Sequence, residues 1–326
     1  MTMIRSHSAA GYRPLTPGDP IPADAVWIDL YKPTAEEEAM VEALVGIDVP
    51  TADDMAEIET SSRLYVDNGV LVMTATLATG IITEDPRIVP VSFVLAKDHL
   101  ITVRYEEIRS FDRYAAQLEK MPGACGEAVT ALMGLIDAIV DRLADGLEHV
   151  GHEVDQISKA TFRRANPHHR GQQQRRSNLA LQALITRLGS AQDALSKARE
   201  SVVSLGRALT FLQAASPRHA ALAAAIKTQQ RDLASLADQA SFVGNNLNFL
   251  LDATLGLISI EQNAVLKIIS VASLVFLPPT LIAGVYGMNF QHMPELTWLW
   301  GYPMAVGVML AAAIFPYLIF RWKGWL

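Results

Sequence analysis

The pattern of apolar and polar positions changes character twice along the chain, and each change marks a different part of the fold. Between residues 26 and 126, short apolar stretches alternate with turn residues, as in Leu64–Val66, the turn Asp67–Gly69 and the stretch Val70–Thr76. Apolar stretches bounded by turn residues are typical of strands joined by tight turns. Thr34 is followed by three glutamates, Glu36 to Glu38, which is the pattern of a capped helix start. We therefore predict an α/β domain over residues 26–126.

The first 25 residues differ from this domain in their high proline content. They contain Pro14, Pro17, Pro20 and Pro22 and have no apolar core. The lack of an apolar core argues against a secretory signal peptide. We expect residues 1–25 to form a flexible N-terminal arm.

From Glu127 onward the apolar positions recur three and four residues apart, which is the spacing of one helix face. A basic, proline-containing break at residues 163–177 separates the first two helices. The last helix is the longest, because the chain has no proline between Arg218 and Leu277. We predict a stalk of long helices over residues 127–264, the last of them continuous with the apolar segment that follows.

Two uncharged apolar runs end the chain, at Ile268–Tyr286 and Tyr302–Phe320. Each is about long enough to cross a bilayer as a helix, which takes about 20 residues. The loop between them, residues 287–301, has no Lys or Arg, whereas the other ends of the runs carry Lys267, Arg321 and Lys323. Cytoplasmic flanks are enriched in Lys and Arg. We predict a transmembrane hairpin over residues 265–326, with both termini in the cytoplasm and the loop outside.

Composition narrows the class of protein further. The net charge of −7 argues against nucleic-acid binding, and a single cysteine, Cys125, excludes an intrachain disulfide. There is no glycine-rich phosphate loop, which disfavours an ATP-driven pump. Neither apolar run carries a carboxylate, which disfavours proton-coupled exchange. No nucleophile, acid–base pair or cofactor loop stands out, so we expect no enzyme activity and no resident cofactor.

Several motifs of the chain resemble those of the CorA family of divalent-cation channels. They are Gly-Met-Asn at 287–289, Met-Pro-Glu-Leu at 293–296, Asn263–Lys267, Phe276–Thr280, the terminal residues 321–326 and Trp27–Leu30. The resemblance implies an α+β membrane protein with a cytoplasmic α/β domain, a helical stalk continuous with the first transmembrane helix, and a C-terminal two-helix hairpin. It also implies a homopentamer of the inner (plasma) membrane. An oligomer is needed in any case, because two spans per chain cannot enclose a water-filled pathway.

The resemblance places the selectivity filter at Gly287, Met288 and Asn289. A ring of Asn289 carbonyl oxygens would hold Mg²⁺ through its waters, which suits an ion that dehydrates reluctantly. The alternative for Gly287 and Asn289 is a simple helix cap, since both residue types commonly end helices. Glu295 is the acidic residue of the outer loop, and a ring of Glu295 would attract cations. Its alternative is a solvated loop charge.

The first span carries its polar and small residues on one stripe, together with leucines. The resemblance makes Asn263, Leu277 and Thr280 pore-lining. Leu266 and Ile269, with Leu277, would form an apolar gate that closes by dewetting, and Gly284 continues the stripe. Close helix packing is an equal alternative for Gly284. Pro278 and Pro279 predict a local distortion beside Thr280.

Internal divalent ions close the channels that this chain resembles, by binding carboxylates between subunits. Asp252 matches an acidic position of the family, whereas a second regulatory aspartate of the family falls on Thr228 here. Other candidate carboxylates, each more simply read as a solvated charge, are Asp232, Asp238, Asp53, Asp54, Glu57 and Glu59.

The expected function is influx of Mg²⁺, and of Co²⁺ and Ni²⁺, driven by the membrane potential and gated by intracellular divalent ions. The expected partners are further copies of the chain, membrane lipid and divalent cations, not nucleic acid. A Zn²⁺ transporter of the same superfamily is an alternative. Members of that branch resemble one another in having Gly-Val-Asn or Gly-Ile-Asn at the filter, whereas this chain has Gly-Met-Asn. A membrane-anchored sensor or scaffold without transport is a second alternative. The sequence leaves open the selectivity among these ions and the direction of flux.

Overall fold

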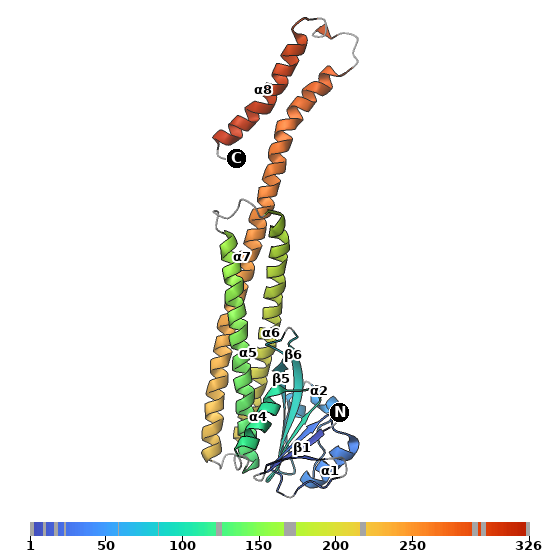
Figure 1. Ribbon diagram of the computed structural model, residues 1–326, viewed down its shortest axis with the longest axis vertical. Coiled ribbons are helices and arrows are strands. Elements are labelled where there is room, and N and C mark those ends of the chain that lie inside the picture. Colours follow the sequence, from blue (N-terminus) through green and yellow to red (C-terminus); the bar gives the residue numbers. More distant parts are fainter. Residues whose placement is uncertain are drawn as a thin grey trace. The chain divides into compact units, whose positions relative to one another are not determined.

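A computed structural model describes residues 3–8, 11–15, 19–22, 24–57, 59–83, 85–121, 126–165, 174–215, 220–288, 293–294 and 298–323. The chain forms two compact units, Met1–Asp252 and Ala253–Leu326. Figure 1 traces both units along the sequence.

The first unit begins with a seven-stranded sheet in the order β2-β1-β3-β7-β6-β5-β4. All neighbouring strands are antiparallel except β3 and β7, which are parallel. The strands are β1 (Met3–Ser8), β2 (Gly11–Leu15), β3 (Trp27–Tyr31), β4 (Leu64–Asp67), β5 (Val70–Thr79), β6 (Arg87–Leu95) and β7 (Leu100–Arg104). Strands β1 and β2 correct the sequence prediction, which placed a flexible arm over residues 1–25. They pair with each other, and β1 also pairs with β3.

One face of the sheet packs against α1 (Ala35–Val45) and α2 (Ala52–Ala56), which contribute Val41 and Met55 to its core, and α3 (Thr60–Arg63) leads directly into β4. Helix α1 begins with the capping box that the sequence predicted, in which Thr34 and Glu37 bond each other's backbone N–H groups. Because side chains alternate between the faces of a strand, every second strand residue enters this core. The buried cluster includes Ile28, Leu30, Ile101, Val103, Val41 and Met55.

The opposite face packs against α4 (Arg109–Lys120), α5 (Ala128–Ala165) and α6 (Gln174–Ala215). The Trp27 ring lies 5.4 Å from that of Tyr114 and 6.2 Å from that of Phe111, both on α4. Helix α6 is tied to β5 by the Thr76 N–H, which donates to Ser204 Oγ at 2.9 Å. The sheet is therefore enclosed between two helical layers.

Three long helices continue the first unit, namely α5, α6 and the first part of α7 (Ala220–Tyr286), which run alongside one another in Figure 1. One apolar stripe of α7, with the spacing of three and four residues noted in the sequence, is buried: Leu233, Leu236, Ala240, Val243, Leu247 and Leu250. Polar contacts add to this packing. Gln229 Nε2 donates to Asp137 Oδ1 on α5 at 2.6 Å, and the Arg187–Glu153 ion pair joins α6 to α5 at 2.7 Å.

The second unit contains the end of α7 and helix α8 (Gly301–Trp322). Both helices are long and apolar enough to cross a membrane, with mean hydropathies of 2.1 and 2.0 over their most apolar windows. Within the chain, 0% of the most apolar stretch of α7 and 6% of that of α8 are buried. Helices of a soluble core would be mostly buried, so these helices match the predicted apolar hairpin rather than a water-soluble core. The predicted fold class is confirmed.

Candidate functional site

The predicted pore residues share one exposed face of α7. All six are exposed in the single chain: Asn263, Leu266, Ile269, Leu277, Thr280 and Gly284. Successive members are three, four or eight residues apart, which places them on one side of the helix, because the helix turns once in 3.6 residues. Leu266 and Leu277 are 60% and 68% exposed. An apolar face this open has no partner inside its own chain, so it must meet something else.

The part of this face nearest the C-terminal end of α7 contains a groove of about 620 Å³. It brings together four predicted residues, Leu277, Thr280, Gly284 and Met288, with Ser273. Three further lining residues were not predicted from the sequence to line a pore: Phe276, Leu281 and Val285. These residues could have been found from their spacing, because each lies one helical turn from another residue of the same face.

Thr280 supplies the polar chemistry of this groove. Its hydroxyl donates to the carbonyl oxygen of Phe276 at 2.7 Å. The hydroxyl has one proton, which this bond uses, so the oxygen presents lone pairs toward the groove. An oxygen that can only accept is suited to a cation or to the waters around a hydrated cation.

The tandem prolines lie on another side of the helix. Pro278 and Pro279 are half-buried, whereas Leu277 and Thr280 beside them are exposed. Helix α7 continues through both prolines without a break in its assignment. Because proline has no N–H, the carbonyls of Leu274 and Val275 lose their usual helical donors.

The start of the predicted filter continues the last turn of α7. Gly287 N–H donates to Ala283 O at 2.9 Å, and Met288 N–H donates to Val285 O at 3.3 Å. Gly287 does not have positive φ, unlike Gly46, Gly69 and Gly80 among the described glycines. The left-handed cap is therefore not used at Gly287. Asn289 and Glu295 lie outside the described residues.

The candidate carboxylates are not gathered into a site within one chain. In the described part of the chain, no group of three or more His, Cys, Asp or Glu side chains could hold a metal ion. Asp252, Asp232 and Asp238 are exposed on α7. Asp54 instead caps α2, and the hydrogen bond from the Thr51 hydroxyl to its carboxylate, at 2.7 Å, lowers the pKa of Asp54.

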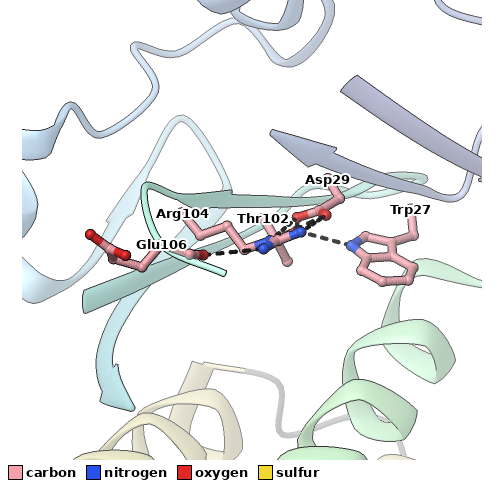
Figure 2. Close-up of polar contacts among 5 residues, drawn as sticks. All are labelled: Trp27, Asp29, Thr102, Arg104 and Glu106. Carbon is pink, nitrogen blue, oxygen red and sulfur yellow. Dashed lines mark hydrogen bonds and ion pairs between the residues drawn. The ribbon is translucent and has the colours of Figure 1, made fainter. Parts of the chain in front are cut away.

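A buried ion pair in the first unit was missed by the sequence analysis. Arg104 and Asp29 are each 1% exposed and make two-point contact, with Arg104 Nη2 at 2.9 Å from Asp29 Oδ2 and Nε at 3.1 Å from Oδ1. Figure 2 shows the network around them. Thr102 donates to Asp29 at 2.8 Å and accepts from Trp27 Nε1 at 3.0 Å. The pair joins the parallel strands β3 and β7, where it fixes their register rather than forming an open site.

Comparison with known proteins relates this geometry to a family. The chain matches the family model described as CorA-like Mg²⁺ transporter protein over residues 22–322. The magnesium transport protein CorA of Escherichia coli (strain K12) is 32% identical over 303 residues, which cover 93% of this chain and 92% of that protein.

Solved structures agree in fold. The complete CorA magnesium transporter from Methanocaldococcus jannaschii matches with a TM-score of 0.74 at 18% identity, covering 100% of this chain and 99% of that chain. The ZntB cytoplasmic domain from Vibrio parahaemolyticus matches with a TM-score of 0.55 at 12% identity, covering 79% of this chain and 97% of that chain. At these identities the structures speak for the fold alone. The family model and the Escherichia coli relative each span more than nine-tenths of the sequence, and the chain belongs to the CorA-like Mg²⁺ transporter family.

Proposed function

We propose that this chain is the subunit of a homo-oligomeric channel, a pentamer, that admits Mg²⁺ through a membrane. The observation that carries the proposal is the exposed face of α7, where Thr280 lies among open apolar side chains of a helix long enough to span a bilayer. The name of the Escherichia coli relative, a magnesium transport protein, supports Mg²⁺ as the substrate. Co²⁺ and Ni²⁺ are further substrates in this proposal.

The pathway would form where the α7 helices of several copies meet. The α7 face in each copy would supply a ring of Thr280 oxygens, with Asn263 at the inner end and Gly284 nearer the outer end. Gly287, Met288 and Asn289 would form the filter, and Glu295 would concentrate cations at the mouth. Neutral oxygen rings hold a hydrated ion loosely enough for it to leave.

The membrane potential would drive the ion inward without a nucleotide. A divalent ion moved across 100 mV gains about 4.6 kcal/mol, twice the value for a single charge. The electrochemical gradient sets this direction, and in the proposal both termini lie in the cytoplasm with the hairpin in the inner membrane. The driving force is then large enough for passive influx.

The gate in this proposal is the apolar part of the same face. Leu266, Ile269 and Leu277 are more than half exposed in the single chain. Rings of these side chains would expel water from a narrow pore when they approach one another. Intracellular divalent ions would close the gate by bridging carboxylates such as Asp252 between copies.

Two alternatives keep a place beside this proposal. A Zn²⁺ transporter is not favoured, because its support is the fold likeness to the ZntB cytoplasmic domain at 12% identity. A membrane-anchored sensor without transport would leave the exposed Thr280 face without a use. Ion flux separates these cases.

The test is Mg²⁺ influx into proteoliposomes under an imposed negative-inside potential and low internal divalent ion. We expect flux in the wild type and its loss to background in Asn289→Ala, with unchanged flux in the matched loop variant Gln291→Ala. Equal flux in both variants would remove Asn289 from the filter. A correctly assembled wild type that passes Zn²⁺ but no Mg²⁺ would favour the zinc alternative, and one that passes neither would favour the sensor.

A further inference from the structure

A second groove lies between α7 and α8 within the second unit. Its volume is about 550 Å³, and its walls are Lys267, Ser270, Val271 and Leu274 from α7 and Phe320 from α8. None of the five is among the residues predicted for the filter or the gate, although Ser270 lies on the polar stripe of α7. Because Phe320 comes from α8, this groove differs from the first one, which is lined by residues of α7 and by Met288 just after it.

The chemistry of the groove changes along its length. Lys267 is the last charged residue before the uncharged run of α7, and Phe320 ends the uncharged run of α8 just before Arg321. The charged end of the groove therefore coincides with the boundary of both apolar runs. From Lys267 to Leu274 the helix rises about 10 Å. The groove thus joins a cation and a hydroxyl, at Lys267 and Ser270, to the apolar side chains of Val271, Leu274 and Phe320.

Charge complementarity points to an anionic occupant. Among the described residues of the second unit, positive charge occurs only at Lys267, Arg321 and Lys323, all at this end of the helices. Lys267 forms no ion pair with any residue that the structure describes. The acidic residue of this part is Glu261, which lies nearly two turns of α7 before Lys267. An ammonium group at the edge of a hydrocarbon layer is stabilised by a nearby phosphate.

We propose that this groove binds one anionic phospholipid of the inner leaflet. The Lys267 ammonium and the Ser270 hydroxyl would contact the phosphate, and an acyl chain would lie along Val271, Leu274 and Phe320. An occupant with an anionic head and an apolar tail satisfies both ends of the groove, which neither a free phosphate nor a neutral detergent does. The proposal rests on the membrane placement in the proposed function but not on ion conduction.

The test is direct lipid binding to the full-length protein purified in neutral detergent. Native mass spectrometry would count bound phosphatidylglycerol and phosphatidylcholine across a lipid titration. We expect phosphatidylglycerol to bind more tightly, and Lys267→Gln to weaken it about fivefold, the factor expected for one cation at an anionic surface. The matched control is Lys227→Gln, which removes an exposed lysine from the first-unit part of the same helix and leaves binding unchanged.

A second variant tests the apolar end. Leu274→Trp fills the groove with a larger side chain and should lower binding of phosphatidylglycerol while Lys267 is intact. Equal binding of the two lipids, or equal effects of Lys267→Gln and Lys227→Gln, would overturn the proposal. So would a disulfide between copies of Val271→Cys in native membranes, because Val271 lines the groove away from the polar stripe and the groove would then be filled by a neighbouring chain. Mg²⁺ flux measured on the same preparations reports on the proposed function separately, since lipid binding is counted without any ion gradient.

Discussion

The two compact units of this chain use the same apolar residue types in opposite ways. In Met1–Asp252, the side chains of Trp27, Phe93 and Phe111 are no more than 2% exposed. In Ala253–Leu326, Phe276 is 70% exposed and Phe315 is 67% exposed. The first unit buries most of its large apolar side chains within the chain, although Phe242 and Phe249 on α7 are 66% and 60% exposed. The second unit presents its apolar surface outward, so its stability must come from a bilayer or from other copies.

The comparison also explains where charge is tolerated. A charge inside the first unit must be paired, because an unpaired buried ion is costly, and Arg104 is paired with Asp29. The apolar runs of the second unit contain no charge at all. We therefore expect the first unit to be most sensitive to loss of its buried ion pair, and the second unit to be most sensitive to a charge added to an apolar run. Substitutions at these points test the comparison directly.

The largest effect is expected from breaking the buried pair. Arg104→Met should cost about 3–5 kcal/mol, because it leaves the Asp29 carboxylate buried without its partner. The measurement is the melting temperature of the purified full-length protein, with hydrogen exchange at β3 and β7 to locate the loss. Arg113→Met is the matched control, since the Arg113–Asp145 pair is exposed and its atoms are 3.9 Å apart. Similar melting of the two variants would mean that the Asp29–Arg104 pair does not hold these strands together.

The next effect compares one substitution at two equally open positions. Leu310 on α8 is 58% exposed and Val66 on β4 is 55% exposed. An aspartate costs about 3 kcal/mol at the centre of a transmembrane helix, whereas exposed substitutions in water usually cost less than about 0.5 kcal/mol. We expect Leu310→Asp to lower the fraction of chain that resists carbonate extraction from membranes, and Val66→Asp to leave it unchanged. If both variants stay fully inserted, the outward face of α8 does not contact lipid.

Much of this architecture was predictable because local pattern determines it. The buried stripe of α7 and the strands β3 to β7 follow from apolar spacing, and the capping box of α1 follows from Thr34 and Glu37. Strands β1 and β2 were missed because prolines and charged residues interrupt their pattern. Pro14 lies on β2, the edge strand of the sheet. An edge position tolerates proline, since its missing N–H is not needed by a further strand, but only the sheet order reveals that edge.

The residues of the candidate sites also differ in how far the sequence alone could predict them. The stripe of Thr280 and Leu277 could be predicted because residues one turn apart share a helix face. The Asp29–Arg104 pair could not, because 75 residues separate its members and only the parallel pairing of β3 with β7 brings them together. The groove at Lys267 likewise depends on Phe320 from a different helix. Contacts within one element follow from spacing, whereas contacts between elements require the fold.

The smallest effect sharpens the comparison at the level of a single methyl group. A Cβ atom added at Gly134 on α5 would lie 2.6 Å from Tyr114 Oη and 2.7 Å from its Cε2. The Tyr114 ring has little room to move, because it is buried and packs against Trp27. We expect Gly134→Ala to destabilise the first unit by about 1–3 kcal/mol, the usual cost of overpacking, measured as a lower melting temperature.

Two further glycines make this test specific. A Cβ atom at Gly206 on α6 or at Gly307 on α8 would meet no atom within 4 Å in the single chain. Alanine favours a helix over glycine by up to about 1 kcal/mol, so Gly206→Ala should raise the melting temperature slightly. Gly307→Ala should be equally harmless if lipid surrounds that face of α8. A loss of assembled oligomer in Gly307→Ala alone would instead place a neighbouring helix against Gly307, and the second unit would then bury part of its surface between copies rather than in lipid.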